Sequence, residues 1–277
     1  PRDIYHPSYW PSIFMTTCQR RRLPWLKTKP LLRSLRSILF IVFVFVSGLL
    51  TGFTALLFFY APRDFLWGLV INFCRLALWA GDFFCGLKIV VEGQKNLPDM
   101  ASVIMIKHSS AFETYGHVPF FPRSTWVCKR SMLWIPFVGW ALKFVFRPIA
   151  IDRNAGGRAV KQIIEQGQKK LKEGTWVTIF PEGTRMPPGE TRRYGISGAA
   201  LAKAAGVSIV PVAHNAADFW QRREITKRSG IVRFCIGPPI DASTQSPEET
   251  NLLVQSWIET KMHEISSGYQ ETSKGVR

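Results

Sequence analysis

A histidine that is followed five positions later by a glutamate is the first pair of residues in this chain that suits acid–base chemistry. His108 and Glu113 come just after an apolar run expected to form a strand, and α/β proteins build their sites where strands end. Histidine has an unperturbed pKa of about 6.5, so its neutral ring can take a hydroxyl proton. A carboxylate bonded to the other ring nitrogen would fix the tautomer and favour the imidazolium. Alone, the pair is better explained as part of an ordinary surface loop.

A second polar cluster, Glu182-Gly183-Thr184-Arg185, also follows an expected strand. Gly183 permits close backbone approach or a positive φ angle, and Thr184 offers a hydroxyl donor. Arg185 carries a planar fork of donors that suits a phosphate group. Taken alone, this cluster is better explained as a strand-ending turn with a solvated Glu–Arg pair.

Considered together and in order, these clusters resemble the motifs of the glycerophosphate and lysophosphatidate acyltransferase family. The family motifs read H-x4-D, K-x2-L-x6-G-x12-R and E-G-T-R, followed by a V-P-V-type strand. The similarity covers roughly residues 88–215, and the order of four motifs is far more specific than any one of them. The matching stretches are His108…Glu113, Lys129…Gly139, Glu182–Arg185 and Ile209–Ala213.

The chain departs from the family pattern at three places. Glu113 stands where aspartate is usual, which keeps the charge and adds one methylene, and Met132 stands where leucine is usual. The distance from Gly139 to Arg153 is one residue longer than in the motif. Arg147 is therefore a second candidate for the role of the motif arginine.

The resemblance implies a mechanism without a covalent acyl-enzyme. His108 would act as general base on the acceptor hydroxyl, with Glu113 orienting its ring, and the hydroxyl oxygen would attack the thioester of acyl-CoA or acyl carrier protein. Lys129 or backbone N–H groups would stabilise the oxyanion, and Arg185, then Arg153, would hold the acceptor phosphate. The expected substrate-binding residues are Lys129, Arg153, Glu182, Gly183, Thr184 and Arg185.

The implied reaction is acylation of the sn-2 hydroxyl of lysophosphatidic acid to give phosphatidic acid. Glycerol 3-phosphate or lyso-ornithine lipid is an alternative acceptor, and a non-catalytic membrane scaffold that gathers anionic lipid is an alternative from another class. We expect no cofactor and no metal, since neither the cysteines nor the histidines have the spacing of zinc ligands. Ser197 does not lie in a G-x-S-x-G elbow, which disfavours a serine hydrolase.

Elements that alternate along the chain must position these residues. Short apolar runs alternating with amphipathic segments predict an α/β fold, with a mostly parallel sheet flanked by helices. The expected strands are Leu87–Glu92, Ser102–Lys107, Thr125–Lys129, Pro148–Ile151, Trp176–Phe180, Val207–Ala213 and Ile231–Ile236. The expected helices are Met132–Phe146, Gly156–Lys172, Ile196–Ala205 and Pro247–Ile265.

An N-terminal helical hairpin is expected to hold the protein at a membrane. No charged residue occurs from Ile38 to Tyr60, and at about 1.5 Å per residue this run could cross a hydrocarbon core of about 30 Å. A second apolar segment follows and would return the chain, or the pair could dip into one leaflet. Basic residues before the first helix indicate a cytoplasmic N-terminus, so we expect a bacterial inner membrane with the catalytic domain on its cytoplasmic face.

The domain organisation that follows has four parts. Residues 1–37 form a basic segment, 38–87 the membrane hairpin, 88–266 the acyltransferase domain, and 267–277 a polar tail expected to fray. The net charge of +17 suits an anionic partner such as an anionic lipid or a phosphorylated ligand. The same charge would suit nucleic acid, but no nucleic-acid motif accompanies it and the uncharged run argues against that partner. The five cysteines are scattered, as in proteins with reduced thiols.

Overall fold

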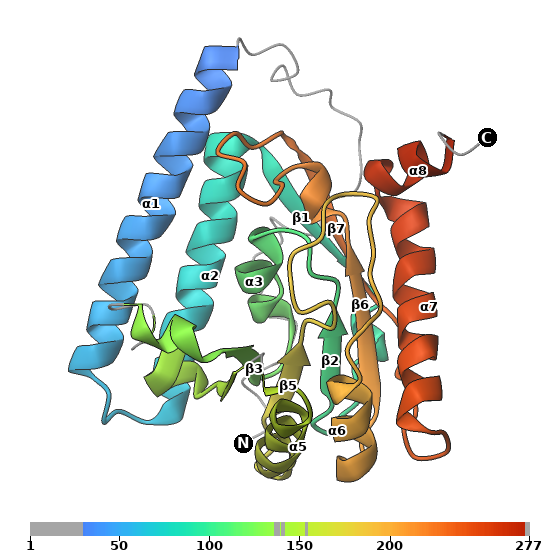
Figure 1. Ribbon diagram of the computed structural model, residues 1–277. Coiled ribbons are helices and arrows are strands. Elements are labelled where there is room, and N and C mark those ends of the chain that lie inside the picture. The colour runs from blue at the N-terminus through green and yellow to red at the C-terminus, as the bar shows by residue number, and fades with distance from the viewer. Residues whose placement is uncertain (1–29, 136–138, 140–141, 153–154, 275–277) are drawn as a thin grey trace.

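A seven-stranded sheet with helices on both faces forms the centre of the protein (Figure 1). The computed structural model describes residues 30–135, 139, 142–152 and 155–274, with side chains up to residue 270. The strands are β1 (Leu87–Glu92), β2 (Val103–Ile106), β3 (Ser124–Lys129), β4 (Ile149–Ile151), β5 (Trp176–Ile179), β6 (Ile209–His214) and β7 (Gly230–Ile236). All seven expected strands are confirmed to within two residues at each end.

The strand order is β1-β7-β6-β2-β5-β3-β4. The strands from β6 to β4 in this order run parallel, whereas β7 is antiparallel to β6 and carries β1 parallel beside it. The expected mostly parallel sheet is therefore confirmed, with a reversed pair at one edge. Because β2, β5 and β3 are parallel, their carboxyl ends lie at the same end of the sheet. The residues that follow these strands therefore come together there.

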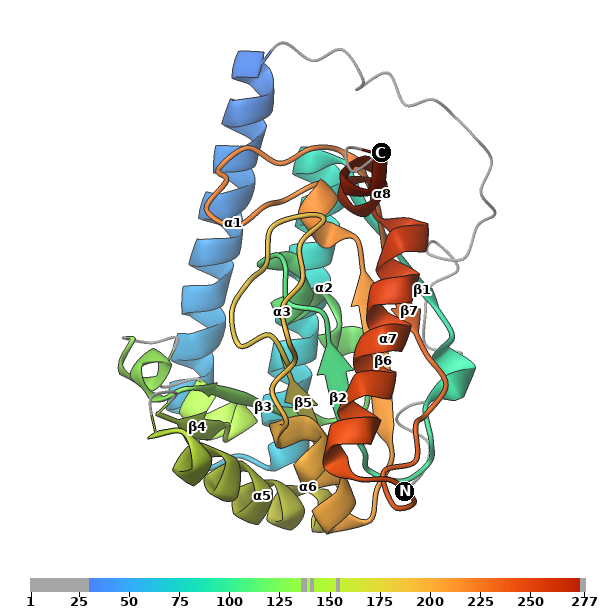
Figure 2. The ribbon, with the colours of Figure 1, turned by 45° about the vertical axis from the view of Figure 1, so that its right-hand side comes forward.

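Alternating side chains of the central strands pack into two hydrophobic layers, one on each face of the sheet. Ile104 and Ile106 of β2 pack with α2 (Arg63–Cys85) and α3 (Phe112–Gly116), whereas Val103 and Met105 pack on the opposite face. That face is covered by α5 (Gly157–Lys172), α6 (Ser197–Ala205) and α7 (Pro247–Ile265), and Figure 2 shows these three helices on one side of the sheet. Both faces of β2, β5 and β6 are therefore buried, which explains their nearly continuous apolar sequences. Short helical turns lie at Gln94–Asn96, Val118–Phe120 and Ala216–Asp218.

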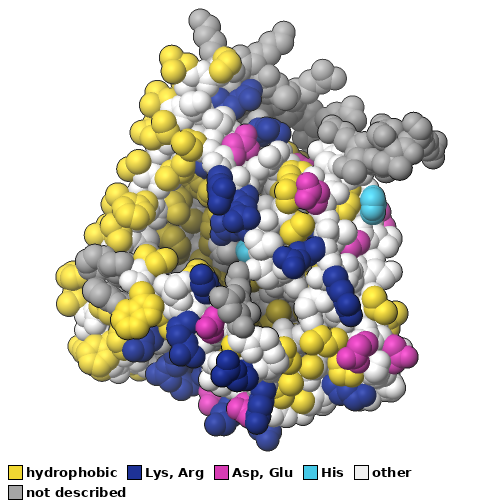
Figure 3. Space-filling view, in the orientation of Figure 1, with side chains coloured by type: hydrophobic (Ala, Val, Ile, Leu, Met, Phe, Trp, Pro, Cys, Tyr) yellow, Lys and Arg dark blue, Asp and Glu magenta, His cyan; other side chains and the backbone are white. Residues whose placement is uncertain are grey.

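The hairpin consists of α1 (Pro30–Leu57) and α2, which pack against each other. Both helices are long and apolar enough to cross a membrane, by length and composition alone. The helix α1 begins at Pro30, before the expected start at residue 38, and its outer side chains are exposed. Hydrophobic side chains gather over α1 in Figure 3. The exposed apolar residues of α1 include Leu31, Leu35, Phe45, Leu50, Phe53 and Leu57.

The expected helix Met132–Phe146 is wrong as a single element. The structure has a 3-10 turn, η7 (Arg130–Trp134), and a short π-helix, η8 (Leu142–Phe146). The sequence places Pro136 in the middle of this range, and a proline inside a helix removes one hydrogen bond and clashes with the preceding turn. A Cβ on Gly139 would lie 2.5 Å from the carbonyl oxygen of Leu133, so the chain is too tightly packed there for other residues. Residues 136–138 and 140–141 lie outside the described residues.

The expectation that the chain frays after Ser266 is also wrong. Residues Ser267–Lys274 form a further helix, α8, and Tyr269 is buried. Its hydroxyl donates to the carboxylate of Glu259 at 2.6 Å. One buried aromatic side chain with a charged partner therefore anchors a segment whose composition is otherwise polar.

Alanine substitutions at two glycines should separate backbone strain from close packing. Gly93, after β1, has φ +79°, and a Cβ there would lie 2.1 Å from the Ile236 carbonyl oxygen. Gly174 has φ +76° and nothing within 4 Å of its Cβ position. Gly174→Ala should lower the free energy of unfolding by about 1–2 kcal/mol. Gly93→Ala should cost about 1–3 kcal/mol more because β7 must move. Denaturant unfolding in mild detergent measures both, and equal losses would contradict the packing account.

Candidate active site

His108 and Glu113 form a hydrogen-bonded pair just beyond the carboxyl end of β2. The Nδ1 atom of His108 lies 2.8 Å from Oε1 of Glu113, and only 12% of the histidine side chain is exposed. Glu113 is in the first turn of α3, which folds the chain back so that the two side chains meet. Because a carboxylate only accepts, Nδ1 carries the proton and Nε2 of the neutral ring keeps its lone pair. The ring of Phe180 packs on the imidazole, with centroids 4.4 Å apart.

The carboxylate of Glu113 is fully buried and accepts several hydrogen bonds. The backbone N–H groups of Ser109 and Ser110 donate to it at 2.9–3.2 Å, in addition to the His108 bond. Burial alone would raise the pKa of Glu113, but the His108 hydrogen bond and the nearby His214 and His108 rings outweigh it and lower the pKa. Glu113 is therefore charged at neutral pH and is suited to stabilise a positive charge on His108.

The Glu182–Arg185 segment lies directly against the backbone of His108. The carboxylate of Glu182 accepts from the His108 N–H at 3.2 Å, and the N–H of Met186 donates to the His108 carbonyl at 2.8 Å. Gly183 turns the chain between these two contacts with φ +67°. The two motifs, far apart in sequence, are thus brought together because β2 and β5 are adjacent parallel strands.

Arg185 offers unused donor capacity beside this pair. Its side chain is partly buried, its Nε is buried without a hydrogen-bond partner, and no ion pair engages it within the described residues. Nearby, the guanidinium of Arg222 donates to the hydroxyl of Thr184 at 3.4 Å. Sequence analysis did not identify Arg222, since no motif or regular element marks its loop. The arrangement leaves guanidinium donors available for an oxyanion such as a phosphate.

The structure adds a fully buried lysine, Lys107, that sequence analysis did not select. Its ammonium lies 3.2 Å from Oε1 of Glu182 and 2.8 Å from Oε1 of Glu259 on α7. The hydroxyls of Tyr194 and Tyr269 each donate to Glu259 at 2.6 Å. A lysine at the end of a wholly apolar strand predicts a carboxylate partner, because an unpaired buried charge is energetically costly. The sequence could not name Glu259 as the partner, because that residue is 152 positions away.

The pKa values of the two carboxylates are shifted in opposite directions. Burial raises the pKa of Glu182 to about 7, against the opposing effect of the Lys107 charge. Burial would also raise the pKa of Glu259, but Lys107 and the hydrogen bonds from the two tyrosines outweigh it and lower that pKa. Glu259 is therefore the firm counter-ion of Lys107, and Glu182 completes the link from this lysine to the backbone of His108.

The remaining site candidates from the sequence divide into three groups. Lys129 ends β3 at the same edge of the sheet as His108 and is exposed. Arg153 lies outside the described residues. Arg147 precedes β4 and therefore lies toward the opposite end of the sheet from His108.

Two further histidines are structural, as their buried positions indicate. His117 donates from Nδ1 to the Glu113 carbonyl, and burial lowers its pKa to about 4. His214 is buried as well and contacts the Lys107 carbonyl at 2.7 Å. Among the residues that the structure describes, no group of three or more His, Cys, Asp and Glu side chains is placed to hold a metal ion. The four cysteines within the described range are buried, and no disulfide joins any two of them.

Comparison with known proteins agrees with this geometry. The family model described as Acyltransferase matches residues 88–215, the stretch that contains both motifs. The fold and the site thus define an acyltransferase. A 1-acyl-sn-glycerol-3-phosphate acyltransferase of Pseudomonas aeruginosa is 38% identical over 248 residues, which cover 87% of this chain and 95% of that relative. The chain belongs to the 1-acyl-sn-glycerol-3-phosphate acyltransferase family.

More distant relatives carry the same description. A 1-acyl-sn-glycerol-3-phosphate acyltransferase of Borreliella burgdorferi is 30% identical over 69% of this chain and 76% of its own length. The crystal structure of the 1-acyl-sn-glycerophosphate acyltransferase PlsC from Thermotoga maritima has a TM-score of 0.70 at 23% identity. It covers 84% of this chain and 95% of that chain, which shows a shared fold. Membership of this family favours an enzyme over the non-catalytic scaffold.

Removing the buried lysine should destabilise the protein in a pH-dependent way. Lys107→Met leaves Glu259 buried without its counter-ion, which should cost about 3–5 kcal/mol of unfolding free energy at neutral pH. Because the folded pKa of Glu259 is lowered, the wild-type ion pair stabilises fully above the usual value of 4.5 and is lost as the pH falls through the lowered pKa. The deficit of the variant should therefore shrink on acidification.

Thermal unfolding in detergent from pH 8 down to about pH 3, through the range in which Glu259 takes up its proton, measures this effect. Lys161→Met on the exposed face of α5 is the control and should change stability by less than about 0.5 kcal/mol at any pH. A deficit in Lys107→Met that did not change with pH would point to lost packing and not to a lost charge pair.

Proposed function

We propose that this protein transfers a fatty acyl group from acyl-CoA or acyl carrier protein to the sn-2 hydroxyl of lysophosphatidic acid, giving phosphatidic acid. The observation that best supports this proposal is the contact of the Glu182–Arg185 segment with the backbone of His108. The ring of His108 is hydrogen-bonded to Glu113. This contact brings the imidazole of His108 and the guanidinium of Arg185 to the same end of the sheet. The family relatives that are named for this reaction support the same assignment.

His108 acts as general base in the proposed mechanism. Its Nε2 takes the proton of the acceptor hydroxyl as the oxygen attacks the thioester carbonyl, and the negative charge of Glu113 stabilises the resulting imidazolium. The tetrahedral intermediate then collapses with cleavage of the carbon–sulfur bond, and the imidazolium returns the proton to the departing thiolate. The histidine is neutral again after each turnover, and no covalent acyl-enzyme is formed.

Fixed positive charge holds the substrate during these steps. Arg185 binds the acceptor phosphate with its unpaired donors, and Arg153 is a second candidate. Lys129, at the end of β3, stabilises the oxyanion of the tetrahedral intermediate. Glu182 holds the His108 backbone in place, and Gly183 and Thr184 form the turn that presents Arg185.

The hairpin brings the site to its lipid substrate. The face of α2 from Leu66 to Cys85 is buried against the catalytic domain, whereas the outer face of α1 is apolar and exposed. A hairpin that lies along the domain in this way favours insertion into one leaflet over a full crossing. We therefore place the protein on the cytoplasmic face of a bacterial inner membrane, with α1 in the acyl-chain region and anionic lipids attracted by the basic surface.

Substitution of the base and its partner should test the mechanism. His108→Ala should abolish acyl transfer, and Glu113→Gln should lower kcat by about 10²–10⁴-fold because the imidazolium loses its counter-charge. The assay follows transfer from acyl-CoA and from acyl carrier protein to labelled lysophosphatidate, glycerol 3-phosphate and lyso-ornithine lipid. The exposed His263→Ala is the matched control and should retain wild-type turnover. Near-native transfer by His108→Ala in a folded protein would refute the role of this base.

Arg185 should be separable from the base by its kinetic effect. Arg185→Gln should raise KM for lysophosphatidate about 10- to 100-fold, because a hydrogen bond to a charged group contributes about 1.5–3 kcal/mol of binding free energy. KM for the acyl donor should not change. Arg193→Gln removes an exposed arginine on the same loop and should change neither constant. Equal KM values for acceptor in wild type and Arg185→Gln would assign the phosphate to another group.

A further inference from the structure

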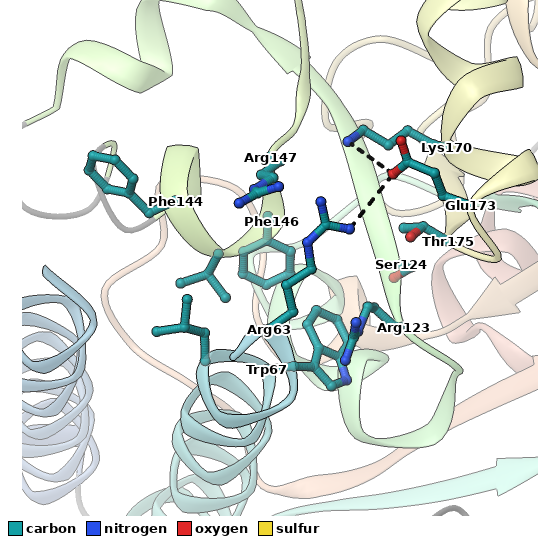
Figure 4. A pocket seen from close by; sticks show the side chains of 12 residues that line it. Arg63, Trp67, Arg123, Ser124, Phe144, Phe146, Arg147, Lys170, Glu173 and Thr175 are labelled. Carbon is teal, nitrogen blue, oxygen red and sulfur yellow. Dashed lines mark ion pairs between the residues drawn. The ribbon is translucent and has the colours of Figure 1, made fainter. Parts of the chain in front are cut away.

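A second cluster of basic side chains surrounds a small pocket on the edge of the sheet opposite the active site. Arg123 and Ser124 stand at the start of β3, and Thr175 precedes β5, whereas His108 follows the end of β2. Because these strands are parallel, the two sites face opposite ends of the sheet. Figure 4 shows Arg63, Arg123, Arg147 and Lys170 around this pocket, with Trp67 and Phe146 among its apolar side chains.

The positive charges in this pocket are only partly neutralised. Arg63 and Lys170 share one carboxylate oxygen of Glu173, at 3.8 and 3.9 Å, and both pairs are longer than a hydrogen bond. Arg123 pairs with Asp64, whose side chain is 77% exposed. The guanidinium of Arg147 has no ion pair or hydrogen bond within the described residues. Four cations therefore face one lining carboxylate.

Two of the residues that line this pocket, Trp67 and Ser124, carry buried donors without partners in the described part of the chain. The indole Nε1 of Trp67 and the hydroxyl of Ser124 have no hydrogen-bond partner within the described residues, although their side chains are 4% and 2% exposed. A buried donor without a partner costs about 1–3 kcal/mol, so two of them at one pocket indicate an acceptor that binds there. Arg147 itself has φ +45°, a left-handed conformation that is unfavourable for an arginine and often marks a binding site.

The donors and charges together specify an oxyanion. An N–H, an O–H and several guanidinium and ammonium groups all donate hydrogen bonds, and their excess positive charge favours an acceptor that carries negative charge. The cavity volume of about 30 Å³ is two to three times the roughly 10–15 Å³ that one bound water needs, so it admits two or three oxygen atoms of a phosphate-like group and not a base or an acyl chain. Only the head of a larger molecule can therefore enter.

The surroundings of the pocket point to a lipid as the source of that group. The turn of the hairpin next to Arg63 exposes Phe58, Phe59, Tyr60 and Phe65. Phe144, which lines the pocket, contacts Phe59 with ring centroids 6.1 Å apart and is itself exposed. Exposed aromatic rings beside basic side chains are typical of residues at a membrane–water interface.

We propose that the pocket lined by Arg63, Arg123, Arg147 and Lys170 binds the phosphate of an anionic phospholipid headgroup, at a site separate from the catalytic one. The bound headgroup satisfies Trp67 Nε1 and Ser124 Oγ and anchors the hairpin turn at the bilayer surface. This assignment does not depend on the acyl acceptor. It concerns a structural lipid that stays bound through turnover.

Ligand-dependent thermal stabilisation of the full chain in neutral detergent tests this site. Dioctanoyl phosphatidylglycerol, dioctanoyl phosphatidylcholine and inorganic phosphate are titrated separately at constant ionic strength. Phosphatidylglycerol should raise Tm with saturation. Arg147→Gln should weaken the apparent affinity for phosphatidylglycerol about fivefold, the factor that corresponds to the binding free energy of about 1 kcal/mol per basic side chain near a lipid surface. Arg158→Gln, an equal charge change at an exposed position of α5 outside the pocket, should bind as wild type does.

Two further variants separate this pocket from the active site and from folding effects. Ser124→Ala removes an unsatisfied hydroxyl, so the Tm without lipid should stay the same or rise, whereas the lipid-dependent shift should decrease. Arg185→Gln, altered at the catalytic edge, should keep the full shift whether or not it transfers acyl groups.

The outcomes decide between the sources of the phosphate group. A saturable shift with inorganic phosphate that is lost in Arg147→Gln would support the oxyanion site and assign it to soluble phosphate in place of a lipid. An equal shift with phosphatidylcholine and phosphatidylglycerol, or an equal phosphatidylglycerol affinity in Arg147→Gln and wild type, would overturn the proposal.

Discussion

The geometry of the candidate active site depends on the pairing of the buried Lys107 ammonium with two carboxylates. A fully buried positive charge is tolerated only if carboxylates and hydrogen bonds replace its hydration, and here Glu182 and Glu259 do so. Through Glu182 the same charge reaches the backbone of His108, and through Glu259 it reaches Tyr194 and Tyr269. One ion-pair cluster therefore joins the end of β2, the loop after β5, α7 and α8.

The proposed catalytic residues occupy the rigid inner part of this arrangement. Glu113 accepts its hydrogen bonds from the backbone of the turn that also carries His108, so the pair is built within one local segment. The guanidinium of Arg185 comes from the loop after the neighbouring parallel strand β5, and a turn at Gly183 precedes it. In the proposed mechanism, a base held by local bonds and a phosphate-binding arginine on a neighbouring loop respond separately to the proposed lipid acceptor and thioester donor.

Sequence patterns predicted the strands well and the long-range polar contacts poorly. Apolar runs bounded by turn residues identified all seven strands, because both faces of the central strands are buried. Periodicity across Met132–Phe146 suggested one helix although Pro136 and Gly139 disfavour it. The partner of Lys107 and the docking of Tyr269 could not be predicted, since both depend on pairing between distant segments. His108, Glu113 and Glu182–Arg185 were identifiable only as a set, through the order of their motifs.

The separation of Lys107 from Glu259 also bears on how the domain is made. Residues of β2 are synthesised long before α7, since 152 positions separate the two side chains. If the sheet formed while the chain was still growing, the Lys107 ammonium would lie in an apolar layer before Glu259, its closest counter-ion, had been translated. Such an unpaired buried charge is energetically costly. Completion of the sheet around β2 should therefore be delayed until α7 has left the ribosome, so that the catalytic edge is assembled after translation of this region and not during it.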